Sequence, residues 1–252
     1  MKIRYLLPAT LVLSASLTSG AAAQSDWEFT IAPYGWMAGI EGDLGTVPGF
    51  PSAPVDLSFG DILEDLDYGF FLFASARNGS WVIFLDGSAV KTTSTESIAG
   101  AAIDKVTIES TTTNLGLAVG YTVFADPNSI VDVYAGARFW WLDNAFEVKS
   151  QPATGLGTVK RDSDATWADP MIGVSGRHTF NDRWSVFGSA DIGGFGVGSE
   201  FAWSAQLGAE YAVTETFGLV AGWRHMSVDY EDDGFVFDVD QSGPLIGATF
   251  RF

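Results

Sequence analysis

Large apolar residues alternate with small or polar ones along most of the chain. Between Leu115 and Val123 every second residue is large and apolar, and the positions between them hold Gly, Ala or Thr. The segments that begin at Val131 and Phe201 repeat the pattern, whereas no long segment has apolar residues at helical spacing. A period of two places alternate side chains on opposite faces of an extended strand. The pattern therefore predicts an all-β protein.

Ten strands account for this alternation. They cover residues 27–40, 66–77, 80–93, 107–124, 130–147, 167–180, 183–195, 200–213, 216–230 and 235–252. Tight turns such as Asn78-Gly79 and Asn181-Asp182 alternate with connections that are mostly longer, the longest being 41–65, 94–106 and 148–166. Short turns at one end and long loops at the other are typical of a transmembrane, antiparallel, up-and-down β-barrel. We expect about ten strands, with eight or twelve as alternatives, because 41–65 could contain a further hairpin.

The first 23 residues have the composition of a secretory signal. Lys2 and Arg4 precede a short apolar core over residues 5–13, and three alanines follow at 21–23. Such a core is too short for a membrane-spanning helix, which needs about 20 apolar residues. We therefore expect residues 1–23 to be cleaved and residues 24–252 to form the barrel domain.

The composition excludes several classes of protein. The chain has 13 Lys and Arg against 31 Asp and Glu, a formal net charge of -18, which disfavours nucleic acid as a partner. It has no Cys, which excludes disulfide scaffolds and Cys-based zinc sites. Its aromatic content of 14% is too high for a disordered chain.

Aromatic residues lie near the ends of the apolar faces, where membrane barrels carry their interfacial girdles. They are Trp27, Phe29, Trp81, Tyr121, Trp141, Trp167, Trp184, Trp203, Phe217 and Trp223. The chain ends in an alternating strand, 247–252, whose last residue is Phe252. In these features the sequence resembles bacterial outer-membrane β-barrel proteins, such as the small OmpA-like barrels, whose last strand typically ends in an aromatic residue.

The resemblance implies a location and partners. It places the protein in the outer membrane of a Gram-negative cell, in contact with outer-membrane lipid and lipopolysaccharide. It also makes Phe252 the signal by which the barrel-assembly machinery recognises the last strand. The number of chains in the assembly is left open, and so is any activity, because a fold does not define one.

The parity of the strands predicts a charged lumen. Six acidic and six basic residues are assigned to inward-facing positions: Glu28, Asp86, Asp132, Asp169, Asp191 and Glu210, with Arg77, Arg138, Arg177, Arg183, Arg224 and Arg251. Charges facing lipid are costly, whereas opposite charges across a narrow lumen can pair. We expect these pairs to fill the interior largely. The net negative charge then belongs to the loops.

Two acidic loops are candidates for a divalent-cation site, because hard cations take carboxylate oxygens. The first has Glu41, Asp43, Asp56, Asp61, Glu64 and Asp65, and the second has Asp229, Glu231, Asp232 and Asp233, opposite Asp238 and Asp240. Their spacing matches no EF-hand, and a solvated, repulsive surface is the favoured interpretation, so we expect no metal and no cofactor. Residues 59–66 have the spacing of a short helical turn, and we favour packing on the barrel rim over a plug.

Catalytic motifs are sparse. His225 and Ser227 form a His-x-Ser pair on the lipid side, and this resembles outer-membrane lipid A deacylases, in which His activates Ser for attack on an acyl ester. That family also has a Glu downstream, and here only Asp238 or Asp240 could replace it. No motif marks the paired Asp residues and the Asp-His pair of an omptin-like protease. The glycine-rich stretch 193–198 lacks the Lys and the helix of a phosphate loop, so we interpret it as a tight connection.

These observations lead to one expectation about function. We expect a structural or surface role without enzymatic activity, for a barrel whose lumen is charged and largely filled. A small porin for solutes is the alternative, and a lipid A esterase is a third possibility.

Overall fold

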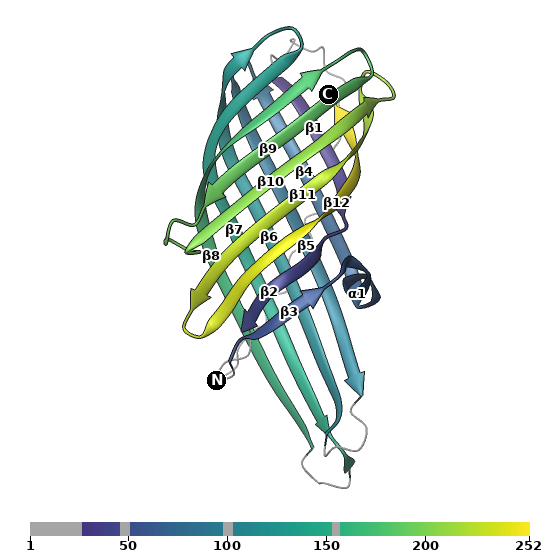
Figure 1. The fold of residues 1–252 in the computed structure, drawn as a ribbon, viewed down its shortest axis with the longest axis vertical. Coiled ribbons are helices and arrows are strands. Elements are labelled where there is room, and N and C mark those ends of the chain that lie inside the picture. The colour runs from purple at the N-terminus through teal and green to yellow at the C-terminus, as the bar shows by residue number, and fades with distance from the viewer. Residues whose placement is uncertain (1–26, 46–50, 98–102, 153–156) are drawn as a thin grey trace, which may run out of the picture.

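The computed structural model describes residues 27–45, 51–97, 103–152 and 157–252, and the expected signal segment lies outside these ranges. The chain forms one antiparallel sheet that closes into a barrel (Figure 1). Ten strands make the wall: β1 (Trp27–Trp36), β4 (Leu66–Asn78), β5 (Trp81–Ser97), β6 (Ile103–Ala125), β7 (Ser129–Ser150), β8 (Thr158–Thr179), β9 (Trp184–Gly193), β10 (Phe201–Ala212), β11 (Phe217–Asp232) and β12 (Phe235–Arg251). Consecutive wall strands pair, and β1 pairs with β12 to close the ring. The predicted ten-stranded, up-and-down barrel is confirmed.

Two further strands lie outside the ring. The predicted strand 27–40 is interrupted at Met37 and Ala38, after which β2 (Gly39–Gly45) continues along β12. β3 (Ala53–Leu57) pairs with β2, so the long connection 41–65 does contribute to a hairpin. At the interruption a Cβ on Gly243 would lie 2.1 Å from the carbonyl oxygen of Met37, a space that only glycine fits. At Gly243-Pro244, β12 changes its partner from β2 to β1.

The short helix α1 (Phe59–Glu64) begins with a capping box. The Ser58 hydroxyl accepts the backbone N–H of Asp61 at 3.3 Å, and the Asp61 carboxylate accepts the N–H of Ser58 at 2.9 Å. The helix contacts β2 and β3 and buries none of its residues. It lies beside the barrel rim, as favoured above, and does not plug the lumen. Within the described ranges no helix is long and apolar enough to span a membrane.

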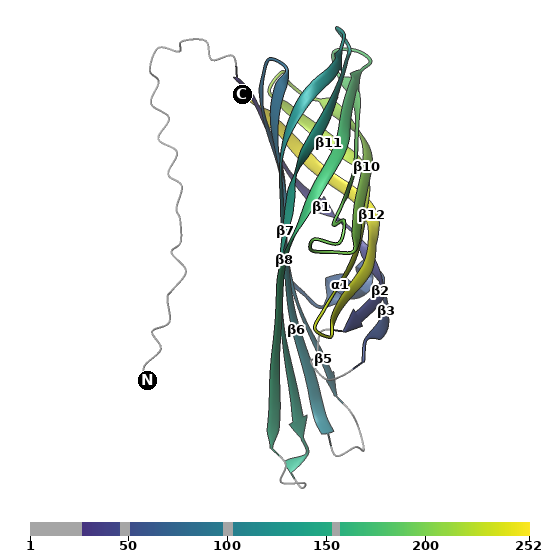
Figure 2. The ribbon, with the colours of Figure 1, turned by 90° about the vertical axis from the view of Figure 1, so that its left-hand side faces the viewer.

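Strands β5 to β8 project beyond the rest of the barrel, at the end opposite the termini of the wall (Figure 2). We call this the distal end, and the end with Trp27 and Phe252 the terminal end. Because β5 runs to Ser97 and β7 to Ser150, the prediction of loops over 94–106 and 148–166 is wrong for much of their length. Both faces of a projecting sheet meet water, so its strands need no apolar alternation. The exposed end of β5, Thr95–Ser97, shows this, since Thr favours strands without being apolar.

Candidate functional site in the barrel lumen

The alternation along each strand sorts side chains between the lumen and the outer wall. In β7, Asp132, Arg138 and Trp140 point inward and are buried, whereas Val133 and Trp141 lie exposed on the outer face. The same parity holds on the other strands, so inward-facing residues far apart in sequence meet in the lumen. They form an aromatic layer at the distal end and layers of ion pairs toward the terminal end.

Six buried aromatic residues fill the distal half of the lumen, and we call them the aromatic plug. They are Trp36, Trp140, Trp167, Tyr230, Phe235 and Phe237. The rings of Trp167 and Tyr230 stack with centroids 3.8 Å apart, and those of Trp140 and Trp167 stack at 5.5 Å. Stacked rings from β7, β8 and β11 thus meet inside the lumen. Assigning Trp167 to the outer girdle was wrong: it lies two residues before inward-facing Asp169 and therefore shares its face.

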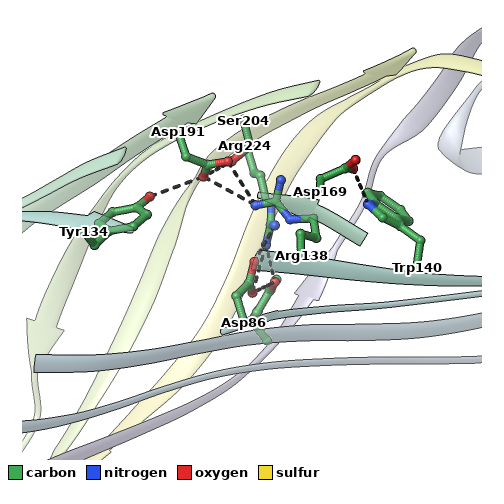
Figure 3. A network of polar contacts seen from close by, with 9 residues as sticks. Asp86, Tyr134, Arg138, Trp140, Asp169, Asp191, Ser204 and Arg224 are labelled. Atoms are coloured by element: carbon green, nitrogen blue, oxygen red, sulfur yellow. Dashed lines mark hydrogen bonds and ion pairs between the residues drawn. The ribbon is translucent and has the colours of Figure 1, made fainter. Parts of the chain in front are cut away.

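A buried carboxylate fastens the plug to the wall. Asp169 accepts hydrogen bonds from the indole N–H groups of Trp140 and Trp167, both at 3.1 Å. It also accepts the Ser199 hydroxyl at 2.9 Å and the Ser199 backbone N–H at 2.7 Å. Figure 3 shows the contact between Asp169 and Trp140. No cation pairs with Asp169 among the described residues, so its predicted place in an ion-pair network is wrong. Four neutral donors replace the water that the carboxylate lost.

Ser199 and the tryptophan donors had not been assigned to the site from the sequence. Ser199 lies at the end of the glycine-rich connection between β9 and β10 and is fully buried. Its neighbour Gly198 approaches Asp169 so closely that a Cβ there would lie 2.6 Å from the carboxylate. The glycines therefore let this connection pack against the wall. In the sequence, only the run of glycines indicated a close contact in this connection, and it could not identify Asp169 as the residue contacted.

Two ion pairs lie in the lumen beside the plug (Figure 3). The Arg224 guanidinium donates to both carboxylate oxygens of Asp86, at 3.1 and 2.5 Å, and lies over the Trp36 ring. Arg138 pairs with Asp191 at 3.2 Å, and Ser204 and Tyr134 donate hydroxyls to the same carboxylate. The Arg224–Asp86 pair joins β11 to β5 across the lumen, whereas the Arg138–Asp191 pair joins β7 to β9 over the intervening strand β8. Both pairs therefore connect strands that are not hydrogen-bonded neighbours.

Two further groups of charges lie toward the terminal end. Arg77 donates to both oxygens of Asp132, at 3.1 and 2.6 Å. Glu210 is fully buried, and both Arg177 and Arg251 pair with it. Nine of the twelve residues assigned to the charged lumen therefore lie in ion pairs inside it: Arg77, Asp86, Asp132, Arg138, Arg177, Asp191, Glu210, Arg224 and Arg251.

Two other assigned residues differ from the expectation. Arg183 lies in the turn before β9, where its guanidinium donates to the Tyr211 hydroxyl and sits over that ring. Tyr211 packs against outward-facing Trp184, so Arg183 belongs to the outer rim, and placing it in the lumen was wrong. The parity of a strand does not extend into its turn. Glu28 lines the lumen at the terminal end, but it is exposed there.

The lumen is not filled throughout. A cavity of about 740 Å³ extends from Asp86 and Arg224 to the terminal rim at Phe252. Inward-facing glycines leave room for this cavity. A Cβ on Gly173 would lie 2.5 Å from the ring of Tyr134, and a Cβ on Gly208 would lie 2.5 Å from the ring of Phe187. Each ring therefore lies flat over a glycine of the next strand and lines the wall without crossing the lumen. The expected filled lumen is found only at the distal end.

Carboxylates form rows on the outer face of the distal end. Asp43, Asp229 and Asp238 are aligned in register across β2, β12 and β11, and Asp240 lies in the next row. Burial, and then the charges of Asp229, Asp43 and Asp240, raise the pKa of the Asp238 carboxyl. The candidate ligands Glu231, Asp232 and Asp233 follow at the end of β11 and in the turn after it. Within the described residues no group of three or more such side chains is arranged to hold a metal ion.

The His225 and Ser227 side chains share the outer face of β11. The Nε2 atom of His225 lies 3.6 Å from Asp240 Oδ1 and makes no hydrogen bond, and the His225 ring packs on Trp203 at 4.5 Å. Ser227 is the cross-strand partner of Asp240. No hydrogen bond in the described part of the chain joins Ser227 to His225, so the nucleophile and the base are not connected.

The sequence profile described as the outer membrane protein beta-barrel domain matches residues 9–252. The chain belongs to this family. Membership of this outer-membrane barrel family implies an outer-membrane location. None of the curated proteins compared with the chain matches it in sequence.

The chain is similar to several solved structures of outer-membrane proteins. The outer membrane protease OmpT from Escherichia coli is similar with a TM-score of 0.54 and 9% identity, over 93% of this chain and 99% of that one. The translocator domain of the autotransporter NalP from Neisseria meningitidis has a TM-score of 0.45 and 13% identity, over 89% and 88%. Ail, the attachment invasion locus protein of Yersinia pestis, has a TM-score of 0.33 and 10% identity, over 90% and 99%. At these identities the likeness to OmpT concerns the fold alone.

Proposed function

We propose that this protein is a closed outer-membrane barrel whose role is carried by its distal surface, without pore activity. The aromatic plug carries the proposal. Stacked rings from opposite parts of the wall, held by Asp169, occupy the distal half of the lumen. A hydrated path for solutes would have to replace these contacts, and buried aromatic stacks are among the stronger packing interactions of a protein interior.

The structure that extends beyond the wall of the barrel lies mostly at the distal end. Strands β5 to β8 extend there as a sheet with ion pairs on it, between Lys91 and Glu109 at 3.1 Å and between Lys160 and Glu147 at 2.5 Å. An even number of wall strands returns both ends of the barrel to one side of the membrane, the periplasmic side in this class of protein. The distal sheet then faces the outside of the cell.

Planar-bilayer recordings test whether the lumen is closed. We expect no stable single-channel steps from the wild type, and steps from the Trp167→Ala, Tyr230→Ala double variant, which removes the 3.8 Å stack. Trp141→Ala is the matched control, because this Trp lies on the outer face of the neighbouring strand and its loss leaves the plug intact. Stable steps from the wild type would refute the proposal and favour a small porin.

Single cysteines test the orientation, because the chain has no native Cys. A cysteine at Asp162, on the distal part of β8, should react with an impermeant maleimide on intact cells. One at Gly79, in a turn at the terminal end, should react only after the outer membrane is permeabilised. The reverse pattern would place the distal sheet in the periplasm and contradict a surface role.

A second candidate, a lipid A-modifying esterase, is favoured by one observation. The Asp240 carboxylate lies beside His225, at the place where that enzyme class needs an acid. Mass spectrometry of lipid A from cells that express the wild type or Ser227→Ala decides the question. An acyl pattern that differs between the two would support the esterase, and an unchanged pattern would exclude it.

A further inference from the structure

We propose that the free edge of β8 at the distal end binds the same edge of a second copy of the protein, which lies in an apposed membrane. The proposal rests on the proposed surface role of the distal sheet. Strand β8 pairs with β9 only from Met171 onward, and the connection between β9 and β10 covers β8 at Ala168 and Pro170. In the part of the chain that the structure describes, no strand pairs with residues 158–166 on that side.

The backbone of this edge can pair with another strand. The N–H of Ser150 donates to the carbonyl oxygen of Gly157 at 3.0 Å, so Gly157 and every second residue after it form the hydrogen bonds from β8 to β7. The residues between them direct their N–H and C=O groups to the free side, and all of them are exposed: Thr158, Lys160, Asp162, Asp164 and Thr166. A free edge of this kind is a template on which a further strand adds.

Charges on a free edge normally prevent such pairing, but the order of charges on β8 is complementary to itself. When two copies of the edge meet antiparallel about a two-fold axis at Asp162, Lys160 of each copy lies opposite Asp164 of the other. The remaining pairs bring no other like charges together: Thr158 with Thr166, Val159 with Ala165, and Arg161 with Ser163. Opposite charges and Thr pairs in such positions stabilise a sheet.

The charged residues of the edge are available to a second copy. The side chain of Lys160 is 70% exposed, and its ammonium, which pairs with Glu147 of β7 at 2.5 Å, carries three donors. Asp164 is exposed, and none of the ion pairs between described residues includes it. Two Lys160–Asp164 pairs can therefore form between the copies without breaking an ion pair within either of them.

The antiparallel arrangement places the two copies in different membranes. In the projecting sheet β8 runs along the long axis of the barrel, and it begins with Thr158 at the distal end (Figure 2). Two antiparallel β8 edges therefore belong to barrels that point in opposite directions, as they do in two outer membranes that face each other. Copies in one membrane point the same way, and parallel edges in register would place Lys160 beside Lys160 and Asp164 beside Asp164. The order of charges thus favours pairing between cells.

Association of the protein in lipid nanodiscs that hold one barrel each tests the pairing. Two samples of discs carry different dyes, and fluorescence cross-correlation counts the particles that carry both. We expect wild-type discs to associate. Lys160→Asp and Asp164→Lys each convert both Lys–Asp pairs into like-charge pairs, and each should weaken the association at least about tenfold. A mixture of discs with Lys160→Asp and discs with Asp164→Lys restores both opposite-charge pairs and should associate as the wild type does.

Two further variants sharpen the test. Lys105→Asp is the matched control, because it makes the same change of charge at an exposed position of β6, two strands from the edge, and should leave the association unchanged. Asp162→Asn removes the like-charge pair at the two-fold axis and should strengthen the association. Heat-dependent gel mobility confirms that each variant is folded.

Each contrary result overturns the proposal. Wild-type discs that stay separate would show that the edge does not bind its copy. Unchanged association of Lys160→Asp or Asp164→Lys would place the contact elsewhere, and a mixture of the two that fails to associate would exclude this register. None of these results depends on conductance or on orientation in the cell. Cysteine labelling that placed the distal sheet in the periplasm would refute the surface role while association of the discs persisted, so the two proposals can fail separately.

Discussion

The ion pair between Arg224 and Asp86 gives the sharpest test of how the lumen stabilises the barrel. Its two side chains differ in their access to water: that of Arg224 is 6% exposed, whereas that of Asp86 is 25% exposed. Asp86→Asn leaves a buried guanidinium without its counter-charge. Arg224→Met leaves a carboxylate that water in the cavity can reach. The two substitutions should therefore have unequal effects, although they remove the same pair.

The structure sets the expected magnitudes. Removing one partner of a buried ion pair costs about 3–5 kcal/mol, because the remaining charge is left uncompensated. We expect this loss for Asp86→Asn. A smaller loss should follow Arg224→Met, for which hydration of Asp86 replaces part of the interaction. The Asp86→Asn, Arg224→Met double variant buries no charge at this position and should be more stable than Asp86→Asn alone.

Urea titration of the protein in lipid vesicles, followed by tryptophan fluorescence, measures these free energies of unfolding. Lys160 and Glu147 are the matched control: their side chains are 70% and 40% exposed, and Glu147→Gln should leave the titration midpoint unchanged. The double-mutant cycle gives the coupling between the two lumen residues directly. Losses that simply add in the double variant would refute the argument that pairing, and not each side chain separately, stabilises the lumen.

Three further predictions concern other parts of the barrel. Asp169→Asn keeps the shape of the side chain but turns an amide N–H toward a donor, so it should lower the free energy of unfolding by about 1.5–3 kcal/mol in the same titration. Asp238→Asn should raise the midpoint near pH 7, and the gain should shrink as the pH falls. A carboxyl whose pKa is raised by folding destabilises the folded state only while it is ionised. Phe252→Ala should refold normally in vitro, because the backbone bonds to Phe29 remain, but should accumulate less in the outer membrane of cells.

Specific results would contradict each of these predictions. An unchanged midpoint for Asp169→Asn would mean that the tryptophan and serine donors find other partners. A stabilisation by Asp238→Asn that grew at low pH would contradict the raised pKa that burial and the acidic neighbours give to the Asp238 carboxyl. Wild-type amounts of Phe252→Ala in the outer membrane would show that the exposed terminal ring is not the assembly signal.

Much of the wall could be predicted from the sequence. Alternation is a local property: a residue such as Trp140 or Trp141 faces in or out according to its position in one strand, whatever its partners are. The tight turns are equally local. The prediction was wrong at the projecting parts of β5 to β8, since sheets with both faces in water carry no alternation, and at Arg183, where a turn breaks the parity.

The partners across the lumen were decided by the tertiary structure alone. The sequence by itself determined an all-β barrel, its number of wall strands and most of its inward-facing charges. It could not show that Asp169 binds two indoles and a serine in place of an arginine, because those residues meet only when the sheet closes. Nor could it divide the lumen into a plugged distal half and a cavity. That division depends on which rings lie over which glycines, and the register between strands, a property of the closed sheet, determines those pairs.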